Sequence, residues 1–113
     1  MASKQSTIDY IAEQITQAGN LRYRKMFGEY AIYCNEKVVA FVCDDELFLK
    51  PTKAGRALIE HLDEAPPYPG AKLYYRISAD LWEDREFLTQ LIAATAAELP
   101  LPKPKKKSVK RTA

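Results

Sequence analysis

The beginning of the chain carries a helical pattern of apolar side chains. Four of them recur at spacings of three and four positions and would form one stripe along a helix: Ile8, Ile11, Ile15 and Ala18. Ser6 or Thr7 can cap the start of this helix by accepting a backbone N–H bond, and Gly19 follows its last apolar position. We therefore predict a first helix that begins at Ser6 or Thr7 and ends at Gly19.

The following residues change to the two-residue alternation and the aromatic and β-branched composition that are typical of strands. The predicted strands span residues 21–27, 29–34, 38–43, 46–50 and 72–78. Residues 38–43 are apolar on both sides, which predicts a central strand covered on both faces, or on one face and by a partner. Residues 46–50 are expected to form an outer strand with Leu47 and Leu49 on one face. Asn35 is expected to adopt a positive φ angle in the hairpin before residue 38.

Two more helices are predicted in the second half of the chain. The first is short and runs from a cap at Thr52 to Leu62, and the second begins at a cap formed by Ser78 or Asp80. The proline-rich connector 65–70 is expected to be neither helix nor ladder strand. The resulting order is helix, three to four strands, helix, strand, helix. It predicts an α+β domain with an antiparallel sheet of about five strands and helices packed on one face.

Basic residues are concentrated at the end of this 113-residue chain. Six of the 17 lysine and arginine side chains lie in residues 100–113, which contain no acidic residue, so that residues 1–99 keep the other 11 and all 15 acidic side chains. The six are Lys103, Lys105, Lys106, Lys107, Lys110 and Arg111. We predict one folded domain at residues 1–99 and a disordered tail at residues 100–113. The tail could bind nucleic acid weakly, or an acidic partner.

The overall composition is that of a globular protein, with 47% hydrophobic and 28% charged residues. No segment has the roughly 18 consecutive apolar residues of a membrane span, and the N-terminus lacks a signal-peptide pattern. We therefore expect a cytoplasmic protein without membrane contact. Because cytosolic thiols are kept reduced, Cys34 and Cys43 are expected to be free and buried. Their position on neighbouring antiparallel strands leaves a cross-strand disulfide as the alternative.

Candidates for catalysis or metal binding are few. His61 has no nucleophile at a persuasive spacing and is expected at the surface. The acidic turn 44–46 lacks the spaced ligands of a calcium loop and is interpreted as a solvated hairpin tip. With no Cys-x-x-Cys pair and no phosphate-cradling glycine loop, we predict no catalytic, metal or cofactor site, and a protein that is not an enzyme. Trp82 is expected to pack in the core, with an interface anchor as the alternative.

Tyrosines are concentrated on the predicted sheet and its connector. They are Tyr23, Tyr30, Tyr33, Tyr68, Tyr74 and Tyr75. With basic residues on the same strands, an open sheet face could stack nucleic-acid bases on these rings. The simpler interpretation is that tyrosine is a good strand residue whose hydroxyl reaches water. A self-complementary surface that forms a homodimer would explain the doubly apolar strand 38–43 equally well.

A set of spaced motifs resembles the N-terminal domain of the TfoX/Sxy family. It comprises the run 24–33 with its Met-Phe-Gly, the segment 39–42, and a Leu-Phe-Leu-Lys strand before Pro51, and the likeness covers residues from about 5 to 98. The matching positions are Arg24, Lys25, Met26, Phe27, Gly28, Tyr30, Leu47, Leu49 and Lys50. The resemblance implies regulation of natural-competence genes together with the cyclic-AMP receptor protein.

The chain departs from the family pattern at two glycines. Glu29 stands where the family commonly has a second glycine after the phenylalanine, and Glu36 stands at a hairpin glycine. Full family members also carry a second, helix-rich domain, and we expect this chain to hold the first domain alone. The resemblance then implies a non-catalytic regulatory or adaptor domain that binds a protein partner such as a transcription regulator, with Lys25 and Lys50 facing outward. The alternative hypothesis is a nucleic-acid-binding module that uses the tail and a tyrosine-lined sheet face.

Overall fold

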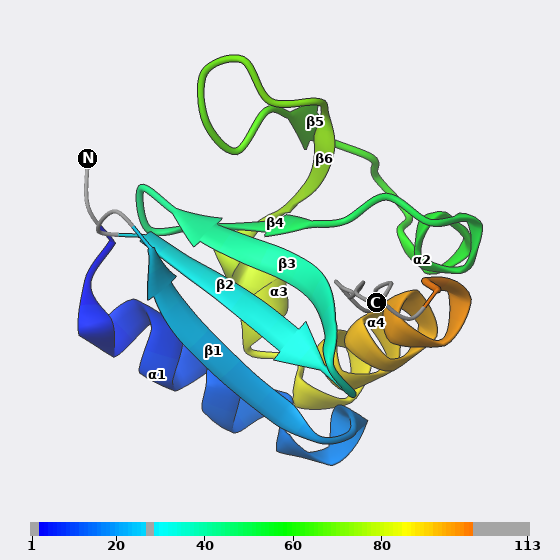
Figure 1. Cartoon of the computed structure of the whole chain (residues 1–113). Coiled ribbons are helices and arrows are strands. Elements are labelled where there is room, and N and C mark those ends of the chain that lie inside the picture. The colour runs from blue at the N-terminus through cyan, green and yellow to red at the C-terminus, as the bar shows by residue number, and fades with distance from the viewer. Residues whose placement is uncertain (1–2, 27–28, 101–113) are drawn as a thin grey trace, which may run out of the picture.

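The computed structural model describes residues 3–26 and 29–100, in which six antiparallel strands form one open sheet (Figure 1). The strands are β1 (Leu21–Met26), β2 (Glu29–Cys34), β3 (Lys37–Cys43), β4 (Glu46–Leu49), β5 (Glu64–Ala65) and β6 (Tyr74–Ile77). Their order across the sheet is β1-β2-β3-β4-β6-β5. The predicted α+β class and antiparallel sheet are confirmed, with a sixth strand added to the expected five.

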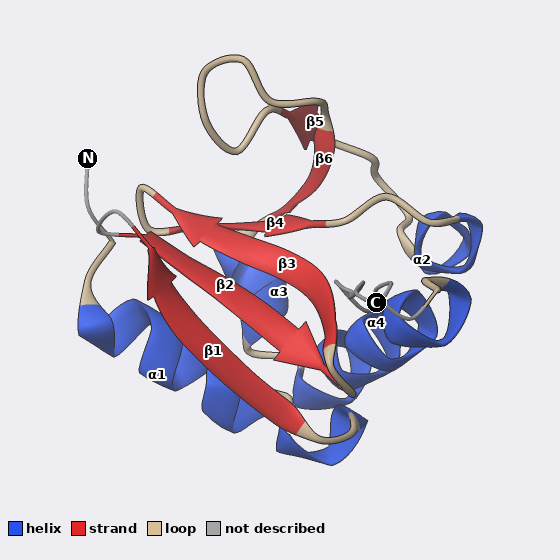
Figure 2. Cartoon of the chain, viewed as in Figure 1, coloured by secondary structure: helices blue, strands red, loops and turns tan. Residues whose placement is uncertain are grey.

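The helices pack behind one face of this sheet, as predicted (Figure 2). They are α1 (Gln5–Gln14), the short 3-10 helix η1 (Thr16–Ala18), α2 (Lys53–Leu58), α3 (Ala79–Trp82) and α4 (Arg85–Glu98). Figure 1 shows α1, α3 and α4 on one side of the sheet, while α2 lies beside the C-terminal part of α4. The sheet therefore has one helix-covered face and a second face, which we call the open face.

The hydrophobic core lies between the helices and the covered face. The predicted stripe of α1 is buried there, because Ile8, Ile11 and Ile15 have no exposed surface. One cross-strand row of the covered face consists of the directly opposite residues Tyr30, Val42, Leu47 and Ile77. All four are at most 3% exposed, and they pack in one cluster with Leu88, Leu91 and Ile92 of α4.

Two tight turns connect the central strands through residues with positive φ angles. Asn35 and Glu36 have φ angles of 53° and 69°, and Asp44 and Asp45 have angles of 54° and 59°. Two consecutive residues at positive φ are typical of the hairpin turn whose twist matches that of the strands. The prediction for Asn35 is confirmed, and Glu36 shows that the second turn position needs no glycine in this chain.

Two predictions about the strands were wrong. Strand β4 is interior, because it pairs with β3 on one side and with β6 on the other. Phe48 is accordingly buried with 6% exposure although it lies on the open face. The connector also contributes to the ladder, since Ala65 pairs with Tyr74 and forms half of β5. A residue before proline favours the extended conformation, and Ala65 precedes Pro66.

The predicted ends of the first two helices also need correction. Helix α1 begins at Gln5, and neither Ser6 nor Thr7 caps it, because the Thr7 hydroxyl donates instead to Asp45 Oδ1 at 2.9 Å. Thr52 does cap α2 by accepting a 2.9 Å bond from the Gly55 N–H, as predicted. This helix ends at Leu58 rather than Leu62. The next residue, Ile59, has an extended backbone conformation and is buried.

The last predicted helix is divided into α3 and α4. The break follows Trp82, whose carbonyl accepts a 2.7 Å bond from Gln14 Nε2 of α1 instead of one from its own helix. Asp84 then caps α4 by accepting a bond from the Phe87 N–H at 3.1 Å. Ser78 is the residue before α3, but its side chain makes no capping bond, and Asp80 lies inside that helix. Trp82 itself is 8% exposed, which confirms the prediction that it packs in the core.

Candidate functional site

The open face of the sheet carries an apolar centre with arginines at both ends. One row of directly opposite residues crosses five strands from Arg24 through Ala31, Phe41 and Phe48 to Arg76. Ala31 and Phe48 are buried by their neighbours, while Phe41 is half-buried and both arginines are exposed. The helices cover the other face, so side chains on this face can meet another molecule.

Three aromatic rings pack together over the middle of the open face, and we call them the aromatic cluster. Phe41 of β3 lies 5.6 Å from the Tyr74 ring of β6 and 6.4 Å from the Tyr68 ring, centroid to centroid. Tyr68 comes from the proline-rich connector and is 54% exposed. Because the Phe41 and Tyr68 rings meet edge to face at 78°, the connector is held against the sheet by a favourable aromatic contact.

A pocket of about 510 Å³ opens beside the aromatic cluster, and we call it the open-face pocket. Its lining residues are Met26, Glu29, Tyr30, Phe41 and Tyr68. Met26 is 39% exposed although it is apolar. The one carboxylate of the lining is already bonded, because Glu29 Oε1 accepts from Ser3 Oγ at 2.6 Å and from the Asp44 N–H at 3.1 Å. The pocket therefore offers an apolar surface suited to an apolar side chain.

Strand β1 adds a row of cations next to this apolar surface. The Arg22 guanidinium lies 4.2 Å from the Tyr33 ring centroid, and it forms an exposed ion pair with Glu36 at 3.3 Å. Arg24 and Lys25 are exposed and form no ion pair with another described residue. The positive charge at this edge is therefore largely available to an acidic group in solution.

The tyrosines do not all share one face, so only part of the set named in the alternative nucleic-acid hypothesis lies on the open face. Tyr23 and Tyr30 point to the helices, where the Tyr23 hydroxyl donates to Asp9 at 3.0 Å and the Tyr30 hydroxyl donates to Gln5 at 3.1 Å. Tyr75 is buried on the same side. The open face carries the remaining Tyr33, with Tyr68 and Tyr74 of the aromatic cluster. Strand alternation explains this division, since neighbouring positions such as 74 and 75 face opposite ways.

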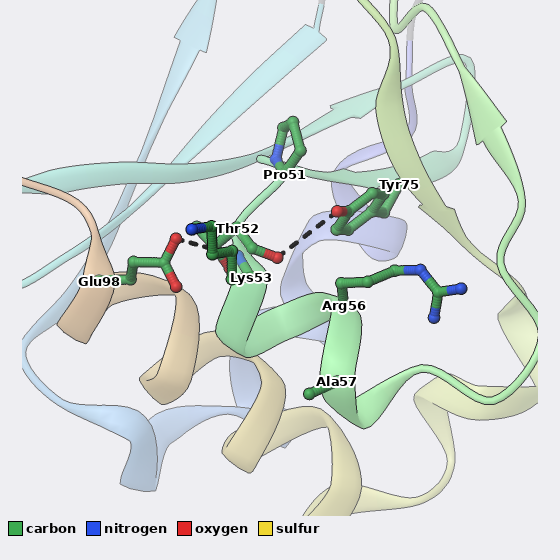
Figure 3. A pocket seen from close by; sticks show the side chains of 7 residues that line it. All are labelled: Pro51, Thr52, Lys53, Arg56, Ala57, Tyr75 and Glu98. Carbon is green, nitrogen blue, oxygen red and sulfur yellow. Dashed lines mark hydrogen bonds between the residues drawn. The ribbon is translucent and has the colours of Figure 1, made fainter.

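A second, more polar pocket of about 540 Å³ lies where α2 meets the end of α4 (Figure 3). Its lining residues are Pro51, Thr52, Lys53, Arg56, Ala57, Tyr75 and Glu98. Figure 3 shows the Tyr75 hydroxyl pointing to the Thr52 carbonyl, to which it donates a 3.5 Å bond. The Glu98 carboxylate accepts bonds from the backbone N–H groups of Ala54 at 2.8 Å and Lys53 at 2.9 Å, which lower its pKa. These hydrogen bonds join α4 to α2 and give the Glu98 carboxylate a structural role in this pocket.

Comparison with known proteins identifies the family of this fold. A family model described as the TfoX N-terminal domain matches residues 13–99. The chain belongs to the TfoX N-terminal domain family. It is 43% identical over 110 residues to an uncharacterised 12.7 kDa protein in the trpE 5′ region of Spirochaeta aurantia, covering 97% of this chain and 95% of that protein. It is 28% identical over 85 residues to protein Sxy of Escherichia coli strain K12, covering 70% of this chain and 41% of Sxy.

The TfoX signature residues that the structure describes do not converge on one place. Arg24, Lys25 and Met26 lie together on exposed β1. Tyr30, Leu47 and Leu49 are buried on the covered face and serve the core. Lys50 is half-buried, and its backbone N–H donates to the Val39 carbonyl at 2.8 Å. Phe27, Gly28 and the six basic tail residues lie outside the described residues. The signature thus combines core positions with one exposed stretch on β1.

The other candidate groups have local structural environments. His61 is exposed, and in the described part of the chain no three metal-ligating side chains gather. The acidic turn is a hairpin tip, where Asp45 accepts a 2.8 Å bond from the Lys4 N–H, and this bond lowers the Asp45 pKa. Both cysteines are free and buried, as predicted, and burial raises the pKa of Cys43 to about 11. A thiol with so high a pKa is a poor nucleophile at neutral pH.

Sequence reasoning missed the open-face pocket. The sequence marks Met26 as a family-signature residue and Phe41 as a strand residue, and it places Tyr68 in a connector whose position relative to the sheet it does not specify. The one usable signal was the apolar character of residues 38–43 on both sides of the strand. In the structure, half-buried Phe41 is the residue responsible for this apolar character on the open face.

Among the described residues, no helix is both long and apolar enough to span a membrane.

Proposed function

We propose that this chain is a non-catalytic regulatory or adaptor domain of the TfoX type, which binds a partner protein through the open face of its sheet. The observation that carries the proposal is the open-face pocket, where exposed Met26 and Tyr68 adjoin half-buried Phe41. Exposed aromatic and methionine side chains around an apolar hollow are the usual anchoring surface of a protein interface. Membership of the TfoX N-terminal domain family supports the regulatory part of the proposal.

The electrostatics of the face favour recognition over chemistry. The pocket carboxylate of Glu29 accepts bonds from Ser3 Oγ and from the Asp44 N–H through Oε1, which gives this residue a structural role in joining the N-terminal segment to the β3–β4 turn. The high pKa of Cys43 argues against nucleophilic catalysis by this thiol. We propose that the domain acts in the cytoplasm on a component of gene regulation, which the TfoX family likeness suggests.

Site-specific photocrosslinking tests the proposal. A photoreactive phenylalanine analogue is placed at position 68 of the full chain, and the cells that naturally make the protein are irradiated. We expect a protein adduct, because Tyr68 is 54% exposed beside the pocket. The matched control is the same analogue at Tyr10, a 40% exposed tyrosine of α1 on the opposite side of the molecule. Equal labelling from both positions, or none from position 68, would reject the open face as the binding surface.

Binding of nucleic acid is the second candidate, and one observation favours it. The Arg22 guanidinium stacks over the Tyr33 ring at 4.2 Å on the open face, close to Arg24 of the same strand. Such pairs of a cation and an aromatic ring can support a stacked base. Fluorescence anisotropy with a labelled single-stranded oligonucleotide should then show affinity that falls steeply with added salt and falls again when residues 103–111 are deleted. Undetectable binding at low salt would eliminate this candidate.

A further inference from the structure

Strand β1 forms the long edge of the sheet. It pairs with β2 alone, and no other described segment makes a backbone hydrogen bond to residues 21–26. Five of its six residues are exposed, and only Leu21 is half-buried. The opposite edge, β5, has two residues. An exposed edge strand can accept a further strand from another chain, and β1 has the length to do so.

The side chains of β1 select the charge of an added strand. Arg22, Arg24 and Lys25 place three cations within four positions, and the strand has no acidic residue. Glu36 pairs with Arg22, whereas Arg24 and Lys25 have no ion-pair partner among the described residues. Directly opposite charges of unlike sign stabilise a strand pair, and like charges destabilise it. The edge therefore favours a strand that carries carboxylates.

Two other occupants fit the charges less well. Pairing of β1 with β1 of a second copy would bring two sets of three cations together, which opposes a homodimer at this edge. The β5 edge of a second copy is too short to cover six residues, and its neighbour Asp63 is already paired with Arg76 at 2.8 Å. A partner protein with an acidic extended segment satisfies both the backbone and the charges.

We infer that β1 is a docking edge for an extended, carboxylate-bearing segment of a partner protein, which adds to the sheet as a seventh strand. This inference rests on the proposed function, because it assumes that the domain acts by binding protein, and it names the chemistry of the bound segment. Backbone hydrogen bonds to the edge supply affinity. Arg24 on the open face and Lys25 on the covered face can pair with carboxylates on opposite faces of the added strand.

A peptide titration tests the inference on the full chain. The probe is a synthetic peptide of about eight residues in which pairs of glutamates alternate with pairs of valines. It is long enough to span the edge and presents carboxylates on both faces of the added strand. Backbone amide NMR spectra and amide hydrogen exchange are recorded on the nitrogen-15-labelled protein. We expect the largest shifts and the largest new exchange protection at residues 21–26. The matched probe, with lysine in place of glutamate, is expected to leave this strand unchanged.

Charge reversal of the edge supplies the second measurement. In the double variant Arg24→Glu, Lys25→Glu, the acidic peptide is expected to bind roughly tenfold more weakly, which is the effect of losing two exposed ion pairs. The lysine peptide should gain affinity. The control is Arg56→Glu, which changes an exposed arginine of α2 away from the edge and should leave both affinities unaltered.

The outcomes separate this inference from the proposed function. If the acidic peptide does not bind, or protects residues other than 21–26, the docking edge is rejected and its cations only prevent edge-to-edge aggregation. A position-68 adduct would still uphold the open face in that case. If the peptide binds the edge while position 68 gives no adduct, the docking edge is supported and the open-face pocket is rejected as the binding surface.

Discussion

The two faces of the sheet have similar aromatic residues but use them differently. On the covered face, Tyr30 is 3% exposed and its hydroxyl is bonded to Gln5 of α1. On the open face, Tyr68 is 54% exposed and contacts Phe41 by ring packing. A buried hydroxyl must be paired to avoid a desolvation cost, whereas an exposed one is hydrated by water. The role of these tyrosines therefore depends on the face of the sheet on which each one lies, and not on residue type alone.

The covered face holds the buried core, and the proposed function assigns recognition to the open face. Residues of the covered face form a continuous core with α1 and α4. The open face instead has the aromatic cluster and, on the edge strand β1, the exposed side chains of Arg22 and Arg24. Substitutions on the covered face should thus change folding, and substitutions on the open face should change binding.

The largest effect is expected from a deletion in the core. Leu49→Ala removes a side chain with no exposed surface, and the free energy of unfolding should fall by about 2–5 kcal/mol because a cavity is added to the lost burial. Chemical denaturation followed by circular dichroism measures it. The matched control Leu73→Ala changes a leucine that is 53% exposed and should stay within about 0.5 kcal/mol of the unmodified chain. Equal losses in both variants would contradict the assignment of stability to the buried side chains of the covered face.

A smaller effect on stability should distinguish Tyr30 of the covered face from Tyr68 of the open face. Tyr30→Phe removes a hydroxyl that donates to Gln5 at 3.1 Å, and should cost about 0.5–1.5 kcal/mol of unfolding free energy. Tyr68→Phe removes a hydroxyl from a largely exposed ring and should cost close to nothing. Thermal melts of the two variants beside the unmodified chain make the comparison. A Tyr68→Phe variant that melts lower than Tyr30→Phe would show that the connector is part of the stable core.

Local periodicity predicted most of the fold. The spacing of Ile8, Ile11 and Ile15 specified the buried face of α1, and the alternation of residues 46–50 placed Leu47 and Leu49 on one face. These features depend on neighbouring positions in the sequence, and so they are visible there. The Thr52 cap is a local feature of the same kind.

Long-range contacts explain why the predictions for the last helix, for strand β4 and for the start of α1 were wrong. The break after Trp82 depends on a bond from Gln14, 68 positions away, and the interior position of β4 depends on β6. The start of α1 likewise depends on Asp45. One signal was available, because Leu47, Phe48 and Leu49 are apolar on both sides of the strand, as an interior strand should be.

The candidate site was less predictable than the fold. Its pocket joins β1, β2 and β3 with Tyr68, whose ring reaches the sheet only because the connector folds back over it. No local pattern specifies that return. The exposed signature positions Arg24, Lys25 and Met26 were named through the family resemblance and not through periodicity, and their role in binding stays a prediction.

The smallest effect concerns a contact that joins the helical layer to the sheet. Asp45 Oδ1, in the turn between β3 and β4, accepts bonds from the Lys4 N–H at 2.8 Å and from the Thr7 hydroxyl at 2.9 Å, and these bonds lower its pKa. Because the folded chain prefers the ionised carboxylate, this contact stabilises the fold at neutral pH. Its contribution is lost as the pH falls below about 4 and the group becomes protonated.

Asp45→Asn should therefore lower the melting temperature slightly at pH 7, and the difference from the unmodified chain should narrow at acidic pH as the Asp45 carboxylate becomes protonated. Melting curves across this pH range measure it. Asp44→Asn is the matched control, because it removes the neighbouring negative charge and leaves the bonds to Lys4 and Thr7 in place. A difference between the Asp45→Asn and unmodified chains that stayed constant with pH would mean that hydrogen-bond geometry, and not charge, joins α1 to the turn.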